Sequence, residues 1–259
     1  MSAELESFCR ERRSLFYPKA DLPVADGVLR TLGSTGNPAH LAPLVAGLCR
    51  GVFGVEPPSV APLGEAGTFH LLYRAERPGG QPVVVRLNAL SHLRPDFLLH
   101  LDSWAGEQLR GVGLPALRVH AVDLSRARCP YDFEVLDEAP GTSLRTYDDD
   151  EDRLRPLLAA LGRFAARVHT IPARGYGFLD VRPLVQSESP ERLCGLSPTW
   201  RVYVLRKLDA HVAACQAIGA VSRDEVGRIY DAFLAADDLL DDGEPALLHG
   251  DLGSHNVFT

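Results

Sequence analysis

The final stretch of the sequence, Leu247–Thr259, reads LLHGDLGSHNVFT. Two apolar pairs, Leu247–Leu248 and Val257–Phe258, flank a polar run that matches the pattern H-x-D-x-x-x-x-N. This spacing is typical of phosphoryl transfer, in which an aspartate accepts the proton of an attacking hydroxyl and an asparagine holds Mg²⁺. A bare Asp and Asn at this distance would more often form a polar turn that bonds its own backbone. The complete string with its apolar flanks favours a catalytic loop between strands.

Composition places the chain among globular proteins. Its 259 residues are 46% hydrophobic and 24% charged, enough for one large domain or two smaller ones. No apolar run approaches the ~20 residues of a spanning helix, and Met1–Arg13 lacks the apolar core of a secretion signal. Five scattered cysteines without a C-x-x-C pair indicate reduced thiols in a cytoplasmic protein. The net charge of -7 argues against a nucleic-acid partner.

The first half of the chain is rich in predicted strands. Alternating apolar residues and a turn at RPGGQP predict a hairpin of Phe69–Ala75 with Val83–Leu87. The remaining expected elements are two helices and two strands, over Leu41–Val52, Pro95–Arg110, Leu117–Val122 and Tyr131–Leu136.

The second half is predicted to be helical. A long apolar stripe runs from Leu154 to Val168, a further helix opens at Ser197–Pro198 and extends to Cys215, and Ser222 with Glu225 forms a capping box. A strand-rich half before a helix-rich half predicts an α+β protein with two lobes. We place the nucleotide-binding N-terminal lobe at residues 1–138 and the helical C-terminal lobe at 139–259.

The chain resembles the aminoglycoside phosphotransferase and choline kinase-like family, small-molecule kinases with the protein-kinase fold. The likeness runs from Leu41 to Thr259 and is strongest in LLHGDLGSHNVF. Upstream, APLGEAGTFHLLYRAE looks like the family's nucleotide loop, VVVRLN like its third strand and YDFEVLDEAPGTSL like its hinge. The resemblance implies ATP and Mg²⁺ as cofactors, Asp251 as the catalytic base, Asn256 as a metal ligand and His249 as a residue that shapes the loop.

Arg86 and Glu107 are predicted to serve the phosphates. Arg86 lies in the apolar strand VVVRLN, where a buried charge needs a partner, and arginine can clamp phosphates with two N–H groups. Glu107 falls on the apolar stripe of its helix three residues after Trp104, which makes it the natural partner of Arg86. The alternatives are an arginine that points to solvent from an edge strand and a solvated helical glutamate.

Backbone groups are predicted to hold the rest of the nucleotide. Gly64 and Gly67, with the neighbouring Thr68, could let backbone amides approach phosphates, although an ordinary β-turn explains G-x-x-G equally well. The adenine is expected to bind backbone groups near Glu134 and Leu136. The sequence contains no G-x-x-x-x-G-K-[ST], which excludes a P-loop enzyme.

Two alternatives to an active kinase remain open. His249, Asp251 and His255 could be ligands of a metallohydrolase, although such a site would want further ligands. The chain could also be a kinase-like binding module or an incomplete catalytic unit.

The position of the motif makes the second alternative serious. Thr259 stands eight positions after Asp251, whereas in the family a later strand carries a second acidic metal ligand. We therefore expect the 259-residue chain alone to be nearly inactive and to self-associate or bind a chain that supplies the missing part. The substrate is expected to offer a hydroxyl, as an aminoglycoside, another antibiotic, an amino alcohol or a sugar does.

Overall fold

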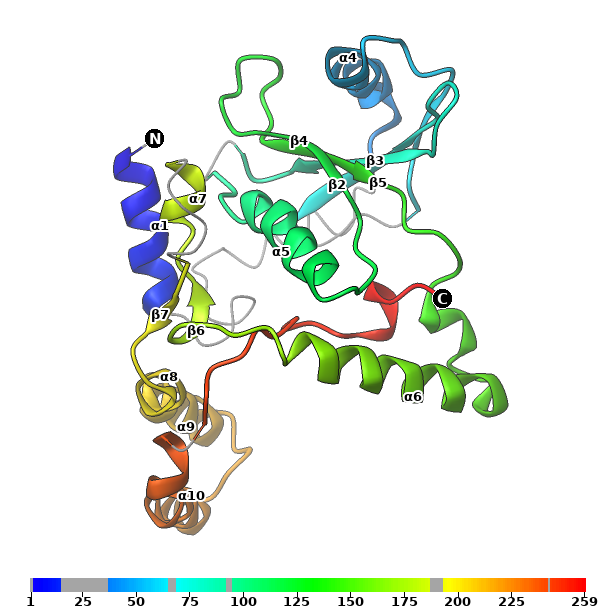
Figure 1. The fold of residues 1–259 in the computed structure, drawn as a ribbon. Coiled ribbons are helices and arrows are strands. Elements are labelled where there is room, and N and C mark those ends of the chain that lie inside the picture. The colour runs from blue at the N-terminus through cyan, green and yellow to red at the C-terminus, as the bar shows by residue number, and fades with distance from the viewer. Residues whose placement is uncertain (1, 15–36, 65–68, 92–94, 187–192, 242) are drawn as a thin grey trace. The chain divides into compact units, whose positions relative to one another are not determined.

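The computed structural model describes residues 2–14, 37–64, 69–91, 95–186, 193–241 and 243–259. They divide into two compact units (Figure 1). The sheet unit contains the described residues of 24–168 and 248–259, and the helical unit contains those of 1–23 and 169–247. This division differs from the expected boundary at residue 138, because the stretch 139–168 and the final loop stay with the sheet.

A five-stranded antiparallel sheet forms the centre of the sheet unit, in the order β1-β2-β3-β5-β4. Buried and partly buried residues alternate along its second and third strands, which is the pattern of a strand with one face on a core. The expected hairpin is confirmed by the pairing of Tyr73 with Val85. The strands are β1 (Val60–Pro62), β2 (His70–Ala75), β3 (Val83–Asn88), β4 (Val119–Asp123) and β5 (Phe133–Asp137).

The two faces of this sheet differ in chemistry. The 3₁₀ turn η1 (Ala39–Leu41) leads into α4 (Ala42–Phe53), whose residues Val45 and Leu48 pack with the apolar side chains of one face. Helix α5 (Leu99–Gly111) lies on the opposite face (Figure 1), where its Asp102 reaches the charged side chain of Arg86. The apolar face therefore forms the core, and the charged face is available for chemistry.

Two segments complete the sheet unit. After β5 come the turn η2 (Leu144–Tyr147) and α6 (Glu151–Val168), which has the acidic residues Glu151 and Asp152 in its first turn. The final loop contains the short turn η5 (Ser254–Asn256).

The helical unit surrounds a two-stranded antiparallel sheet of β6 and β7. The two ends of the stretch 169–247 meet, because Leu247 N–H donates to Ile171 O at 3.0 Å and Ala173 N–H donates to Pro245 O at 3.1 Å. Its elements are α1 (Ser2–Ser14), β6 (Tyr176–Leu179), α7 (Arg182–Val185), β7 (Gly195–Ser197), α8 (Trp200–Leu205), α9 (Leu208–Ala217), α10 (Arg223–Ala235) and the 3₁₀ turn η4 (Asp237–Asp241).

The structure confirms the α+β class and corrects some boundaries. The helix expected from Ser197–Pro198 to Cys215 is two helices, since the chain leaves helical geometry at Lys207. The capping box is confirmed: Ser222 Oγ accepts from Glu225 N–H, and Ser222 N–H donates to the Glu225 carboxylate at 2.8 Å. All five cysteines are free. Within the described ranges, every helix is too short or too polar to cross a membrane.

Candidate active site

The loop that carries the H-x-D-x-x-x-x-N motif is hydrogen-bonded to the segment that follows β5. Leu144 N–H donates to Val257 O at 2.8 Å, and Thr142 and Thr259 exchange main-chain hydrogen bonds of 3.1 and 3.0 Å. This pairing joins residues far apart in sequence and holds the end of the motif loop beside the segment that follows β5. The same contacts explain why the stretch after residue 138 belongs to the sheet unit.

Gly141 permits this close approach. Its φ of 89° lies in the left-handed region, which glycine adopts without the strain that a Cβ atom brings. A Cβ added at Gly141 would stand 2.1 Å from Thr259 O, far inside van der Waals contact. A side chain at this position would therefore displace residues 257–259, the segment that follows the motif (the motif strand).

Hydrogen bonds inside the loop fix the conformation of the predicted catalytic residues. Asp251 N–H donates to His249 Nδ1 at 3.3 Å, across the left-handed Gly250 with a φ of 79°. Asn256 Nδ2 donates to the Asp251 main-chain oxygen at 3.0 Å, and Asn256 N–H donates to Gly253 O at 2.9 Å. Since a carbonyl can only accept, the amide nitrogen of Asn256 must face it. The amide oxygen, a hard ligand that suits Mg²⁺, is left to point elsewhere.

The Asp251 carboxylate and the Asn256 amide are exposed. Apolar neighbours share that exposure: Leu248 is 59% exposed and Phe258 49%. The loop thus presents an aspartate and an asparagine oxygen to whatever binds over it, which is the donor set expected for a base and one metal ligand.

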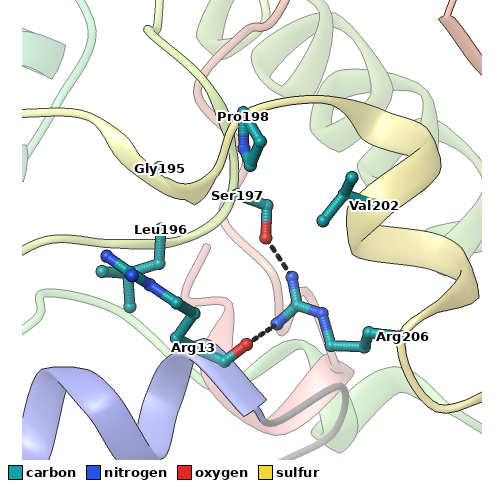
Figure 2. Close-up of a pocket in the computed structure, with 7 residues that line it drawn as sticks. All are labelled: Arg13, Gly195, Leu196, Ser197, Pro198, Val202 and Arg206. Carbon is teal, nitrogen blue, oxygen red and sulfur yellow. Dashed lines mark hydrogen bonds between the residues drawn. The ribbon is translucent and has the colours of Figure 1, made fainter.

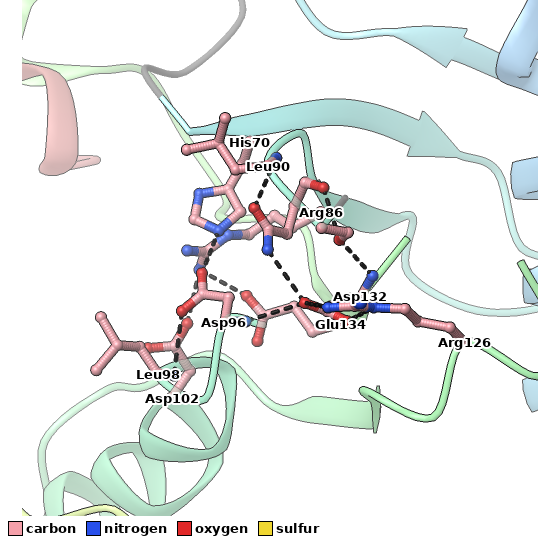
Figure 3. Close-up of polar contacts among 11 residues, drawn as sticks. His70, Arg86, Leu90, Asp96, Leu98, Asp102, Arg126, Asp132 and Glu134 are labelled. Carbon is pink, nitrogen blue, oxygen red and sulfur yellow. Dashed lines mark hydrogen bonds and ion pairs between the residues drawn. The ribbon is translucent and has the colours of Figure 1, made fainter. Parts of the chain in front are cut away.

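Arg86 lies on the charged face of the sheet between two acids (Figure 3). Its Nη1 is 2.6 Å from Asp102 Oδ2 of α5 and 2.6 Å from Glu134 Oε1 of β5. Burial alone would lower the pKa of Arg86, but Glu134 and Asp102 outweigh burial and raise it. The guanidinium therefore stays charged, as a group that holds phosphates must.

Glu134 is a buried acid in the middle of the sheet. Its side chain is 0% exposed, and neither carboxylate oxygen has a hydrogen-bond partner among the described residues. Burial raises its pKa to about 9, because Arg86 compensates only part of the desolvation and Asp102 adds to the rise. The buried Glu134 carboxyl group is therefore a weaker acid than an exposed glutamate.

A second polar cluster fixes the start of α5 (Figure 3). Asp132, which is fully buried, accepts from Asp96 N–H at 2.9 Å and from Asn88 Nδ2 at 3.1 Å, and Arg126 Nε donates to it at 2.8 Å. Asp96 in turn pairs with His70 of β2 at 2.9 Å. Burial would raise the pKa of Asp96, but the hydrogen bond with His70 lowers it. This cluster ties β2 and β3 to the helix that carries Asp102.

Sequence reasoning missed Asp102, Asp96, Asp132 and His70. The signal that could have found Asp102 is a charged residue on a helix with an apolar face. Asp102 and Glu107 both fit that description. The ion pair expected between Arg86 and Glu107 is wrong for the described residues, because Arg86 pairs with Asp102 and Glu134 while Glu107 is exposed. A carboxylate on the solvent side of α5 needs no buried partner.

The adenine contacts expected at Glu134 and Leu136 need correction. Glu134 pairs with Arg86 on β3 and Val122 on β4, and Leu136 pairs with β3 and β4 in the same way. Main-chain groups in the middle of a sheet serve its ladders, so those that remain for a nucleotide come after Asp137. Of the nucleotide-loop residues, Gly64 is described, with a φ of 21°, while Gly67 and Thr68 lie outside the described residues.

Two further features were tested as sites. Within the part of the chain that the structure describes, no three His, Cys, Asp or Glu side chains gather in a way that could hold a metal ion. A pocket of about 380 Å³ in the helical unit has Arg13 and Arg206 in its wall (Figure 2). Arg206 donates to Arg13 O at 2.8 Å, so its guanidinium group supports the pocket wall.

The antiparallel sheet, the helices that follow it and the motif loop together form a kinase-like α+β fold. The chain belongs to the phosphotransferase enzyme family (APH), whose family model matches residues 65–259. The family predicted from the sequence is thereby confirmed. No curated protein sequence matches the chain.

One of two similar solved structures supports the fold. The chain is similar to a candidate fructosamine-3-kinase from Thermobifida fusca, with 20% identity and a TM-score of 0.50, over 80% of this chain and 66% of that one. It is also similar to a candidate aminoglycoside phosphotransferase from Ralstonia eutropha, with 13% identity and a TM-score of 0.43, over 70% of this chain and 48% of that one. The chain thus spans less than two thirds of the length of either protein.

Proposed function

We propose that the protein transfers the terminal phosphoryl group of ATP to a hydroxyl group of a small molecule. The observation that carries this proposal is the pairing of Val257 and Thr259, just after the Asp251–Asn256 loop, with residues 142–144 in the segment that follows β5. This pairing supports the proposal because it joins the loop of the predicted base and metal ligand to the segment that would hold the adenine. Membership of a phosphotransferase family supports the same reaction class.

Each residue has a role in this reaction that follows from its chemistry. Asp251 is exposed, so its carboxylate can accept the proton of the attacking hydroxyl. Arg86 keeps its charge beside Asp102 and can donate its other N–H groups to phosphate oxygens. The main chain after Asp137 can accept and donate to the adenine edge.

Mg²⁺ fits the oxygen of Asn256, which hydrogen bonding leaves unblocked. When bound, the ion neutralises charge that develops on the phosphates. Asn256 is neutral, so the ion would depend largely on the phosphates and on further acidic groups for its affinity. Arg86 shares the task of holding the phosphates.

The acceptor is proposed only as a class. A carboxylate base suits any alcohol, and the panel to be tested comprises aminoglycosides, amino alcohols and sugars, including sugar amines of the fructosamine type. The last of these is included because a structurally similar protein is described as a candidate fructosamine-3-kinase.

Nucleotide binding tests the first part of the proposal. Calorimetric titration of the folded chain with ADP and Mg²⁺ should give a saturable binding isotherm. A folded protein that binds neither ADP nor ATP would overturn the proposed function.

Phosphoryl transfer tests the second part. Because the 259-residue chain alone is expected to be nearly inactive, ADP release is followed with the C-terminal part of a family member supplied in cis or as a second chain. It is measured with each acceptor, for the wild type and for Asp251→Asn, which keeps the size of the side chain and removes the base. General-base catalysis typically contributes ~10²–10⁴-fold, so the variant should lose a factor of that order. Asp231→Asn on the exposed face of α10 is the matched control and should turn over like the wild type. Equal rates for Asp251→Asn and wild type would show that another group takes the proton.

A further inference from the structure

Glu134 occupies an unusual position for an acid. The sheet register places it directly opposite Arg86, on the face away from the apolar core. Its neighbour Val135, one step along the strand, points into that core and is fully buried. Glu134 is thus a buried acid on the charged face, next to Arg86 on the neighbouring strand.

The two acids that contact Arg86 differ in exposure. Asp102, on α5, has a side chain 41% exposed and accepts a hydrogen bond from Arg86 Nη1. Glu134 is 0% exposed, and its 2.6 Å contact with the same nitrogen lacks hydrogen-bond geometry. Asp102 therefore holds the guanidinium group by a hydrogen bond on the exposed side, while Glu134 contacts it on the buried side.

The charges around Arg86 decide whether phosphates can bind there. The groups that face it are Glu134 of β5, Asp102 of α5 and Asp96 before α5, and Asp96 is paired with His70 of β2. If Glu134 were ionised, two carboxylates would surround one guanidinium and the pair of acids would repel phosphates. An uncharged Glu134 leaves Arg86 and Asp102 balanced, with several N–H groups of Arg86 still to donate.

We propose that Glu134 is a positioning residue that holds Arg86 from the buried side, so that the remaining N–H groups of Arg86 face the nucleotide phosphates. The proposal rests on the proposed function, since it assigns Arg86 to the phosphates. Glu134 itself lies under the guanidinium and acts on the nucleotide only through Arg86.

Two variants separate positioning from general stability. Glu134→Leu keeps the volume but removes the polar support, whereas Glu134→Gln keeps a neutral polar group of the same shape. Affinities for ADP and for adenosine, which has no phosphates, are measured by calorimetry at pH 7. The leucine variant should lose about tenfold in ADP affinity, because Arg86 loses its buried polar neighbour and can turn away from the phosphates, and it should bind adenosine like the wild type. The glutamine variant should keep ADP affinity within about threefold of the wild type, because it keeps a polar group of the same shape.

Each other outcome rejects a defined statement. Equal losses for ADP and adenosine would make Glu134 merely structural, and unchanged ADP affinity in Glu134→Leu would remove it from the site. A glutamine variant as weak as the leucine variant would show that an ionised carboxylate is required. Absence of ADP binding to the wild type would overturn the proposed function itself, before any variant is compared.

A pH titration provides a test that does not depend on the leucine variant. Since burial raises the pKa of Glu134 to about 9, the wild type should lose ADP affinity between pH 8 and pH 10, as this carboxyl group ionises. Other groups that titrate in this range are common to both proteins, so Glu134→Gln should lose less. Parallel curves for the two proteins would contradict the proposal.

Discussion

Replacing Glu134 with glutamine should stabilise the protein, and the gain should increase with pH. Burial raises the pKa of Glu134 from 4.5 to about 9. Because the folded state holds the proton more tightly, this group's contribution to stability is complete below pH 4.5 and is lost as pH rises through 9. Between these values each pH unit changes the free energy of unfolding by ~1.4 kcal/mol. At pH 7 the difference amounts to ~3 kcal/mol, which glutamine avoids because it does not titrate.

Urea unfolding followed by circular dichroism at pH 6, 7 and 8 measures this difference. The stability of Glu134→Gln relative to the wild type should grow by ~1.4 kcal/mol for each pH unit. Glu107→Gln on the exposed side of α5 is the matched control and should leave stability nearly unchanged at every pH. A gain from Glu134→Gln that is the same at all three pH values would refute the reasoning, because it would mean that Glu134 does not exchange a proton on unfolding.

Three further perturbations follow from described contacts. Arg86→Ala should weaken ADP binding by roughly 10–100-fold and leave adenosine binding unchanged, as titration calorimetry would show, since it removes the proposed phosphate contacts and leaves the proposed adenine site after Asp137 intact. Gly141→Ala should destabilise the motif strand by ~2–4 kcal/mol through its left-handed φ and its clash with Thr259, whereas Gly47→Ala in α4, where a Cβ meets nothing within 4 Å, should stabilise by up to ~1 kcal/mol. Hydrogen exchange at the Leu144 amide should report the first change and urea unfolding the second; slow exchange in Gly141→Ala would count against it. Leu234, 73% exposed on α10, should promote association, so Leu234→Glu should lower light scattering of concentrated solutions, and equal scattering would contradict this.

The fold was largely predictable because local patterns specified it. The alternation of apolar residues in β2 and β3 predicted their hairpin, and the capping box predicted the start of α10. Boundaries were less certain, since Pro95 opens an irregular stretch and α5 begins only at Leu99. The sequence also gave no sign that α8 and α9 are separate helices.

The partners of Arg86 could not be predicted in the same way. Glu107 is six residues after Leu101, and at ~100° per residue it stands ~120° away from it around the helix, off the inner face. Glu134 lies opposite Arg86 only because β3 pairs with β5 in one register. Long-range register depends on the packing of the whole sheet, which residue spacing does not encode.

The motif strand closes on residues 142–144 over a long intervening stretch, most of which forms the helical unit. The ends of that stretch are hydrogen-bonded to each other near Ile171 and Leu247. Loop-closure free energy grows by only ~0.6 kcal/mol for each doubling of loop length. An insertion with joined ends can therefore be lengthened, shortened or exchanged with little change in the free energy of the pairing between residues 142–144 and the motif strand. The inserted helices and the surfaces that they expose can therefore change in evolution. The aspartate and asparagine of the motif keep their positions, because the motif strand stays paired with residues 142–144.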